Sequence, residues 1–169
     1  MDYFMITLRL IHIFAGISWV GSALLMFFQV FPSINATDEA GQKVVQHLMM
    51  KGRLSSRLTA AGGLTILAGF LLYWLDSDGF TSSWSSSGPG IGFGIGGVAG
   101  LIGFIYGLMV GRYSKALVLL SSEIKDQPTS DQSDKLAALK ISSGRASMLS
   151  TLFLIVAATF MAIARYLNF

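Results

Sequence analysis

The stretch that decides the fold is MITLRLIHIFAGISWVGSALLMFFQVF, residues 5–31. It is long and apolar enough to cross the ~30 Å hydrocarbon core of a bilayer as one α-helix, which takes about 20 residues. The same stretch holds His12, with Arg9 one turn before it. An ionisable side chain at that depth costs about 2.5–3.5 kcal/mol on insertion scales, so it usually faces the protein interior and has a partner or a function. Residues 5–31 therefore predict a membrane span with a candidate site inside it.

The composition of the whole chain agrees with a membrane protein. Of its 169 residues, 53% are hydrophobic and 12% are charged, whereas a soluble domain has about 25% charged residues. The length predicts one domain, residues 1–169. The sequence contains no cysteine, which excludes disulfides, thiolate metal sites and cysteine nucleophiles.

Four segments have the length and apolarity of membrane spans: residues 5–31, 58–75, 90–111 and 146–167. We therefore expect an all-α fold, a bundle of four transmembrane helices in up-down-up-down order. The connections also contain helical patterns. A helix is expected to begin after Thr37, past a break at Pro32, and to run unbroken to Leu75, and the fourth helix to begin at Ser130 or Asp131. These extensions predict two helical hairpins that protrude into the cytoplasm.

The basic residues indicate the orientation in the membrane. Ten of the twelve Lys and Arg residues lie in residues 32–57 and 112–145, while residues 76–89 hold two aspartates and no basic residue. The positive-inside rule places both basic connections in the cytoplasm and both termini on the extracytoplasmic side of the cytoplasmic, or inner, membrane. The net charge of +3 then reflects topology, and we expect no nucleic-acid partner.

A row of glycines marks the third span: Gly92, Gly96, Gly100, Gly103, Gly107 and Gly111. Steps of three and four residues keep them on one helical face. Such a face permits close packing of another helix, or it offers a flat groove to a planar ligand such as a porphyrin. We also expect this glycine face to contact other membrane subunits or a second copy of the chain.

One face of the first helix carries the candidate site residues Arg9, His12, Gly16, Trp19 and Ala23. Three interpretations of His12 stay open. It is a neutral histidine bonded to a hydroxyl or carbonyl across the bundle, an axial ligand of haem iron, or a copper ligand together with methionines such as Met5. The other histidine, His47, lies beyond the opposite end of the membrane, so the two cannot bind one haem within a chain. The sixth position would then be open, or filled by a group other than histidine or by another subunit.

Arg9 and Arg165 are the two basic residues outside the basic connections. They can pair with Asp2, Asp76 or Asp78, or they can bind the carboxylates of a cofactor that carries propionates. The sequence shows no catalytic constellation: it has no Walker loop and no acidic residue within the spans. We therefore do not expect an enzyme that acts on its own.

Three stretches resemble the CopD-like group of small membrane proteins, which includes copper-resistance D-type proteins. They are LIHIFAGISWVG at residues 10–21 with VFP at 30–32, RLSSRLTAAGGLTILAG at 53–69, and MAIARYL at 161–167. The resemblance implies a four-helix bundle in which the histidine of the first helix has a role in haem or copper binding.

The leading hypothesis from the sequence is a membrane protein that binds a b-type haem or a similar tetrapyrrole. His12 is the expected metal ligand, with Arg9, Gly16, Trp19 and Arg165 as further cofactor-binding residues, within a larger electron-transfer assembly. A cofactor-free accessory subunit of a larger membrane complex and a copper-handling protein are the alternatives.

Overall fold

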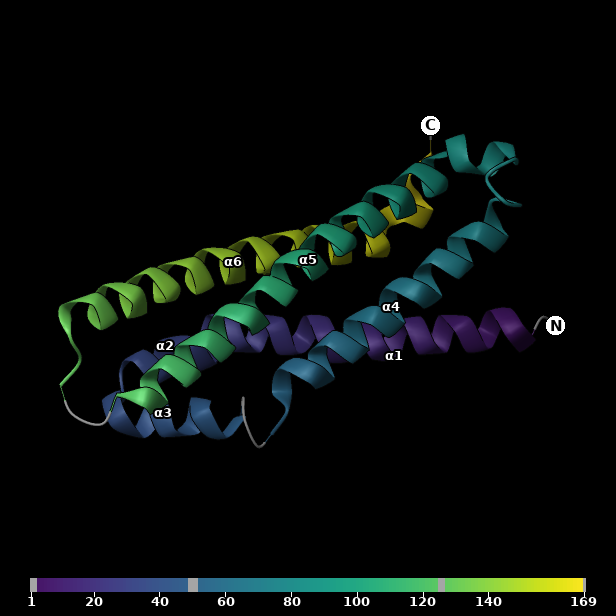
Figure 1. Cartoon of the computed structure of the whole chain (residues 1–169). Coiled ribbons are helices and arrows are strands. Elements are labelled where there is room, and N and C mark those ends of the chain that lie inside the picture. The colour runs from purple at the N-terminus through teal and green to yellow at the C-terminus, as the bar shows by residue number, and fades with distance from the viewer. Residues whose placement is uncertain (1–2, 49–51, 125–126, 169) are drawn as a thin grey trace.

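Four long helices, each antiparallel to the one before it, form the computed structural model, which describes residues 3–48, 52–124 and 127–168 (Figure 1). The elements in chain order are α1 (Tyr3–Leu25), η1 (Met26–Val30), α2 (Phe31–Asn35), α3 (Asp38–Gln46), α4 (Leu54–Asp76), η3 (Ser83–Ser86), α5 (Gly88–Glu123), α6 (Ser130–Ile163) and η4 (Ala164–Tyr166). The predicted all-α, up-down-up-down bundle is confirmed. The start of α1, the loop 77–87 and η4 share one end, here called the terminal end. The connections that hold most Lys and Arg lie at the other, the basic end.

The surface of this bundle is apolar and its interior is built from small residues. Large side chains such as Phe14, Ile17, Leu67 and Val98 point outward, while alanines such as Ala157 are buried between the helices. Because lipid is as apolar as these side chains, helices in a membrane associate through small residues that let the backbones approach. Four helical segments, Tyr3–Ile34, Leu54–Asp76, Gly88–Glu123 and Ser130–Tyr166, are long and apolar enough to cross a bilayer. The chain is an integral membrane protein.

The glycine face of α5 packs against α6. A Cβ atom at Gly96 would lie 3.3 Å from the Ala157 carbonyl oxygen, and one at Gly103 would lie 3.0 Å from Leu154. Gly107 faces the Ser150 hydroxyl. The face therefore serves close helix packing, the first of the two interpretations. Because α6 of the same chain covers it, the face is not free to meet another subunit as the sequence suggested.

The first span continues past Pro32 instead of ending there. Before the proline the helix widens into the π turn η1, in which the Phe31 N–H donates to the Met26 carbonyl five residues back. Pro32 then occupies the first turn of α2, where a missing N–H is tolerated. The expected break is wrong, because the π turn absorbs the mismatch that a proline causes in a regular helix.

The expected continuous helix from Thr37 to Leu75 is also wrong. The Gly52 N–H donates a 2.8 Å hydrogen bond to the His47 carbonyl, a six-to-one bond typical of helix ends. Arg53 then adopts a left-handed conformation with φ of 49°, which a regular helix does not accept. Two helices result, α3 and α4, with residues 49–51 outside the described part. The fourth helix begins at Ser130 as expected, with Thr129 and Gln132 forming a capping box.

Candidate functional site

The candidate site lies in the seam between α1 and α4. The two helices meet in antiparallel register, and each contact pairs a larger side chain with a smaller or oppositely charged one. From the terminal end inward the pairs are Arg9–Asp76, His12–Gly69, Gly16–Thr65 and Trp19–Gly62. The predicted face of the first helix is thus the face that meets α4, and His12 lies in the middle of this seam.

The imidazole of His12 is fixed by a hydrogen bond to the main chain of α4. Its Nδ1 lies 2.8 Å from the carbonyl oxygen of Thr65. A carbonyl oxygen can only accept, so Nδ1 carries the hydrogen and, in the neutral ring, Nε2 keeps the lone pair. The Thr65 carbonyl is thus the hydrogen-bond partner across the bundle that the first interpretation of His12 predicts.

Gly69 provides the space that the imidazole occupies. A Cβ atom at position 69 would lie 2.7 Å from Cε1 and 2.9 Å from Nδ1 of His12, closer than real Cβ contacts. The ring therefore lies over the bare backbone of α4. It is half-buried, with one edge held by Thr65 and one face against Gly69.

The second ring nitrogen of His12 has a different environment. Nε2 makes no hydrogen bond to any residue in the described part of the chain. Nε2 also differs from the Ser82 hydroxyl oxygen, which is fully buried and has no hydrogen-bond partner in the described part of the chain. Nε2 thus keeps its lone pair and is not sealed off from its surroundings. A histidine that binds a metal usually donates its other N–H to a carbonyl or carboxylate in this way.

The two arginines named from the sequence lie apart. Arg9 forms an ion pair with Asp76 at 3.8 Å, with 47% of its side chain exposed. This pairing is one of the two outcomes expected for Arg9. Arg165 lies in η4, which packs against α5, and the described residues give it no ion-pair partner. The structure therefore does not bring Arg165 into the seam with His12.

Trp19 and Gly16 belong to the packing of the seam. Trp19 is only 5% exposed, and its ring meets Phe104 of α5 edge to face, with centroids 5.6 Å apart. A Cβ atom at Gly62 would lie 2.9 Å from the indole, so this glycine is needed for the ring to fit. Trp19 ties α1, α4 and α5 together two helical turns away from His12.

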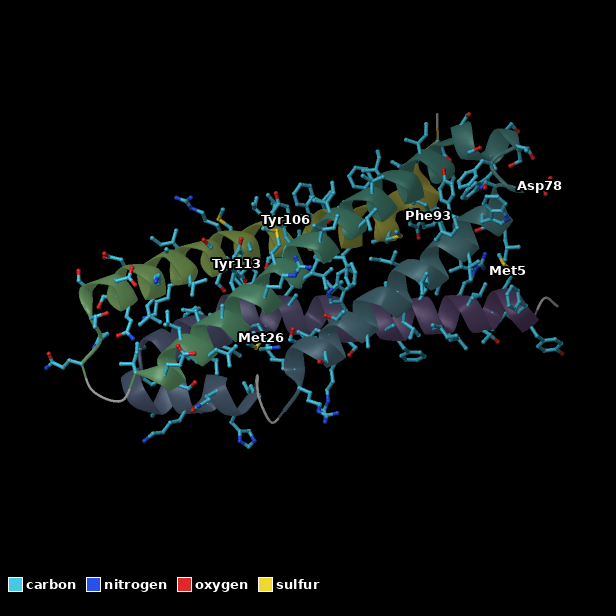
Figure 2. The ribbon with its side chains drawn as sticks, viewed as in Figure 1. Met5, Met26, Asp78, Phe93, Tyr106 and Tyr113 are labelled. Carbon is cyan, nitrogen blue, oxygen red and sulfur yellow. The ribbon has the colours of Figure 1, made fainter. Side chains whose placement is uncertain are left out.

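Few other groups that bind metals lie near His12. Within residues 3–48, 52–124 and 127–168, no three His, Cys, Asp or Glu residues come together to hold a metal ion. Met5, the methionine named for copper, lies on α1 at the terminal end, two turns before His12 (Figure 2). His47 is exposed after α3 at the basic end. The prediction that the two histidines lie too far apart to share one haem within a chain agrees with these positions.

The sequence predicted the α1 side of the site but not the α4 side. It named the face of the first helix that carries His12, but not the residues of α4 that meet this face. Gly62, Thr65 and Gly69 are spaced three and four residues apart, which places them on one helical face. That spacing is the signal that could have identified the surface that receives His12.

Comparisons with known proteins add no relative to this description. No protein-family model matches the chain, and the searches of curated proteins and of solved structures found no match.

Proposed function

We propose that this membrane protein binds a b-type haem or a similar tetrapyrrole through Nε2 of His12, as part of an electron-transfer assembly. The observation that carries the proposal is the hydrogen bond from Nδ1 of His12 to the Thr65 carbonyl. That bond fixes the tautomer and the orientation of the ring, and it makes Nε2 a better donor to iron. A histidine with only a packing role needs no such accessible nitrogen.

The macrocycle would lie on the outside of the α1–α4 pair. His12 is not in the lining of the small cavity between the helices toward the basic end, nor in that of the open hollow formed by residues 29–44. The haem would therefore bind between this chain and a neighbouring subunit or lipid. A neighbouring subunit could then supply the sixth ligand, which agrees with the proposed assembly.

Arg9 is the residue best placed to meet a propionate. It lies one turn before His12 on the same helix, and nearly half of its side chain is exposed despite the pair with Asp76. A carboxylate from the cofactor would share the guanidinium, which has five N–H donors. Gly16 lies one turn on the other side of His12 and leaves room beside the ring.

The visible absorption spectrum of the detergent-purified protein tests the proposal. A Soret band that survives washing is expected for the unaltered chain, and His12→Ala should remove it. His47→Ala is the matched control, because His47 is the other histidine and lies at the basic end. His12→Gln keeps a donor for the Thr65 carbonyl without an imidazole for iron. A Gln variant that is folded and colourless supports ligation, and one that keeps the full Soret band contradicts it.

A cofactor-free accessory subunit is the second candidate. The observation that favours it is the same hydrogen bond, because a histidine that fastens α1 to α4 already has a structural role. A preparation without colour and without metal by elemental analysis would support this candidate. Copper in a 1:1 ratio, lost in His12→Ala, would support copper handling instead.

A further inference from the structure

A cavity lies between the helices toward the basic end, separate from His12. It is partly open to the surface and has a volume of about 80 Å³. Trp19 and Phe104 border it on one side, and Met26 of the π turn lines it as well; Figure 2 labels Met26 beside the first turns of α4. Five hydroxyl residues from α4 and α6 also line it: Ser55, Thr59, Ser147, Ser150 and Thr151. Most of the lining is apolar, but five hydroxyls from two helices interrupt it, and we call it the hydroxyl cavity.

Two of the residues that carry these hydroxyls are almost fully buried. Thr151 is 3% exposed and Ser147 is 8% exposed, yet neither makes a hydrogen bond within the described part of the chain. Elsewhere in these helices the usual solution is a bond to the carbonyl four residues back, as Thr65 forms with Ala61 at 2.8 Å. The oxygens of Ser147 and Thr151 are not sealed off, unlike that of Ser82, so water in the cavity can reach them. A hydroxyl that reaches neither a protein partner nor water is costly, so native proteins rarely leave one in that state.

The remaining hydroxyls lie on two walls of the cavity, one formed by α4 and the other by α6. Ser150 donates to the Gly103 carbonyl at 2.8 Å, so its oxygen can still accept. Ser55 and Thr59 come from α4 on the opposite wall. No hydrogen bond joins these α4 hydroxyls to those of α6 among the residues that the structure describes. A molecule that bridges these hydroxyls must both donate and accept hydrogen bonds, because every hydroxyl does both.

We propose that the hydroxyl cavity is a binding site for a small cluster of water molecules that links α4 to α6. One water needs only about 10–15 Å³ of cavity volume, so about 80 Å³ leaves room for several. Each water needs two to four polar partners, and the five hydroxyls supply them. The neighbouring π turn is a local departure from helix geometry of the kind often found at functional sites.

Hydroxyl-radical footprinting of the purified protein in lipid nanodiscs tests the proposal. X-ray radiolysis turns water into radicals that oxidise only side chains in contact with that water. Trp19 is the reporter, because it borders the cavity and is only 5% exposed. Met148 is the matched control: it follows Ser147 in α6 at the same depth, but points outward and is 52% exposed. We expect Trp19 to be oxidised several-fold faster than Met148, which points outward and does not line the cavity. Equal, slow rates would show a dry cavity and overturn the proposal.

Variants of the deeply buried hydroxyls show which groups hold the water. The double variant Ser147→Ala/Thr151→Val keeps the volume of the side chains nearly unchanged and should reduce oxidation of Trp19 to the rate of Met148. Thr151→Ser keeps a hydroxyl and should leave that rate unchanged. Circular dichroism and elution volume confirm that each variant is folded. Oxidation of Trp19 that persists in the folded double variant would overturn the assignment of these hydroxyls.

Discussion

Gly69 and His12 occupy the same space on opposite helices: a Cβ atom on the glycine would lie 2.7 Å from Cε1 of the imidazole. The hydrogen bond from Nδ1 to the Thr65 carbonyl depends on this close approach. The site thus depends on the absence of a side chain at position 69 of α4 as much as on the histidine of α1.

Substitution at position 69 should displace the imidazole. We expect Gly69→Ala to lower the free energy of unfolding by about 1–3 kcal/mol, the usual cost of overpacking, because the backbone of α4 cannot retreat from the ring without opening the seam. Unfolding in mixed micelles followed by circular dichroism measures the change.

Gly63→Ala is the matched control on the same helix. A Cβ atom at Gly63 meets nothing within 4 Å, so alanine there should be neutral or should stabilise the helix by up to about 1 kcal/mol. Equal losses for both variants would show that a glycine in α4 matters for the helix itself, and not for the room it gives His12. Under the haem proposal, Gly69→Ala should also shift or weaken the Soret band, and Gly63→Ala should leave it unchanged.

The seam between α5 and α6 offers a second glycine pair. A Cβ atom at Gly103 would lie 3.0 Å from Cδ2 of Leu154, which is fully buried and has no open side to move toward. We expect Gly103→Ala to cost about 1–3 kcal/mol in the same unfolding assay.

Gly97 lies on α5 as Gly103 does, but a Cβ atom at position 97 meets nothing within 4 Å. Gly97→Ala should therefore be tolerated. If Gly103→Ala proved as harmless as Gly97→Ala, the close packing of α6 on the glycine face would be contradicted.

The sequence predicts the features of this fold that depend on side chains, but not those that depend on the backbone. The four spans follow from hydropathy along the chain, and the face that carries His12 follows from helical periodicity, so both were predictable. The partner of His12 was not, because a main-chain carbonyl such as that of Thr65 leaves no mark in the sequence. The continuation past Pro32 was missed because a π turn adjusts the backbone without a distinctive residue pattern.

The ion pair between Arg9 and Asp76 should contribute little to stability. The atoms are 3.8 Å apart and both side chains are partly exposed, and exposed pairs typically contribute about 0–1 kcal/mol. We expect Asp76→Asn to change the free energy of unfolding by less than about 1 kcal/mol. A double-mutant cycle with Arg9→Gln measures the coupling between the two charges, and a coupling well above that range would show that the bilayer screens them less than water does.

The orientation in the membrane is the last prediction, and the absence of cysteine from the chain makes it simple to test. Single cysteines can be placed at Thr81, in the loop at the terminal end, and at Ser133, near the start of α6 at the basic end; both residues are exposed. The excess of Lys and Arg at the basic end predicts that this end is cytoplasmic. In intact cells, an impermeant maleimide should therefore label Thr81→Cys and leave Ser133→Cys unlabelled until the cells are lysed. Labelling of Ser133→Cys before lysis, with Thr81→Cys protected, would reverse the orientation and would move the Arg9–Asp76 pair to the cytoplasmic side.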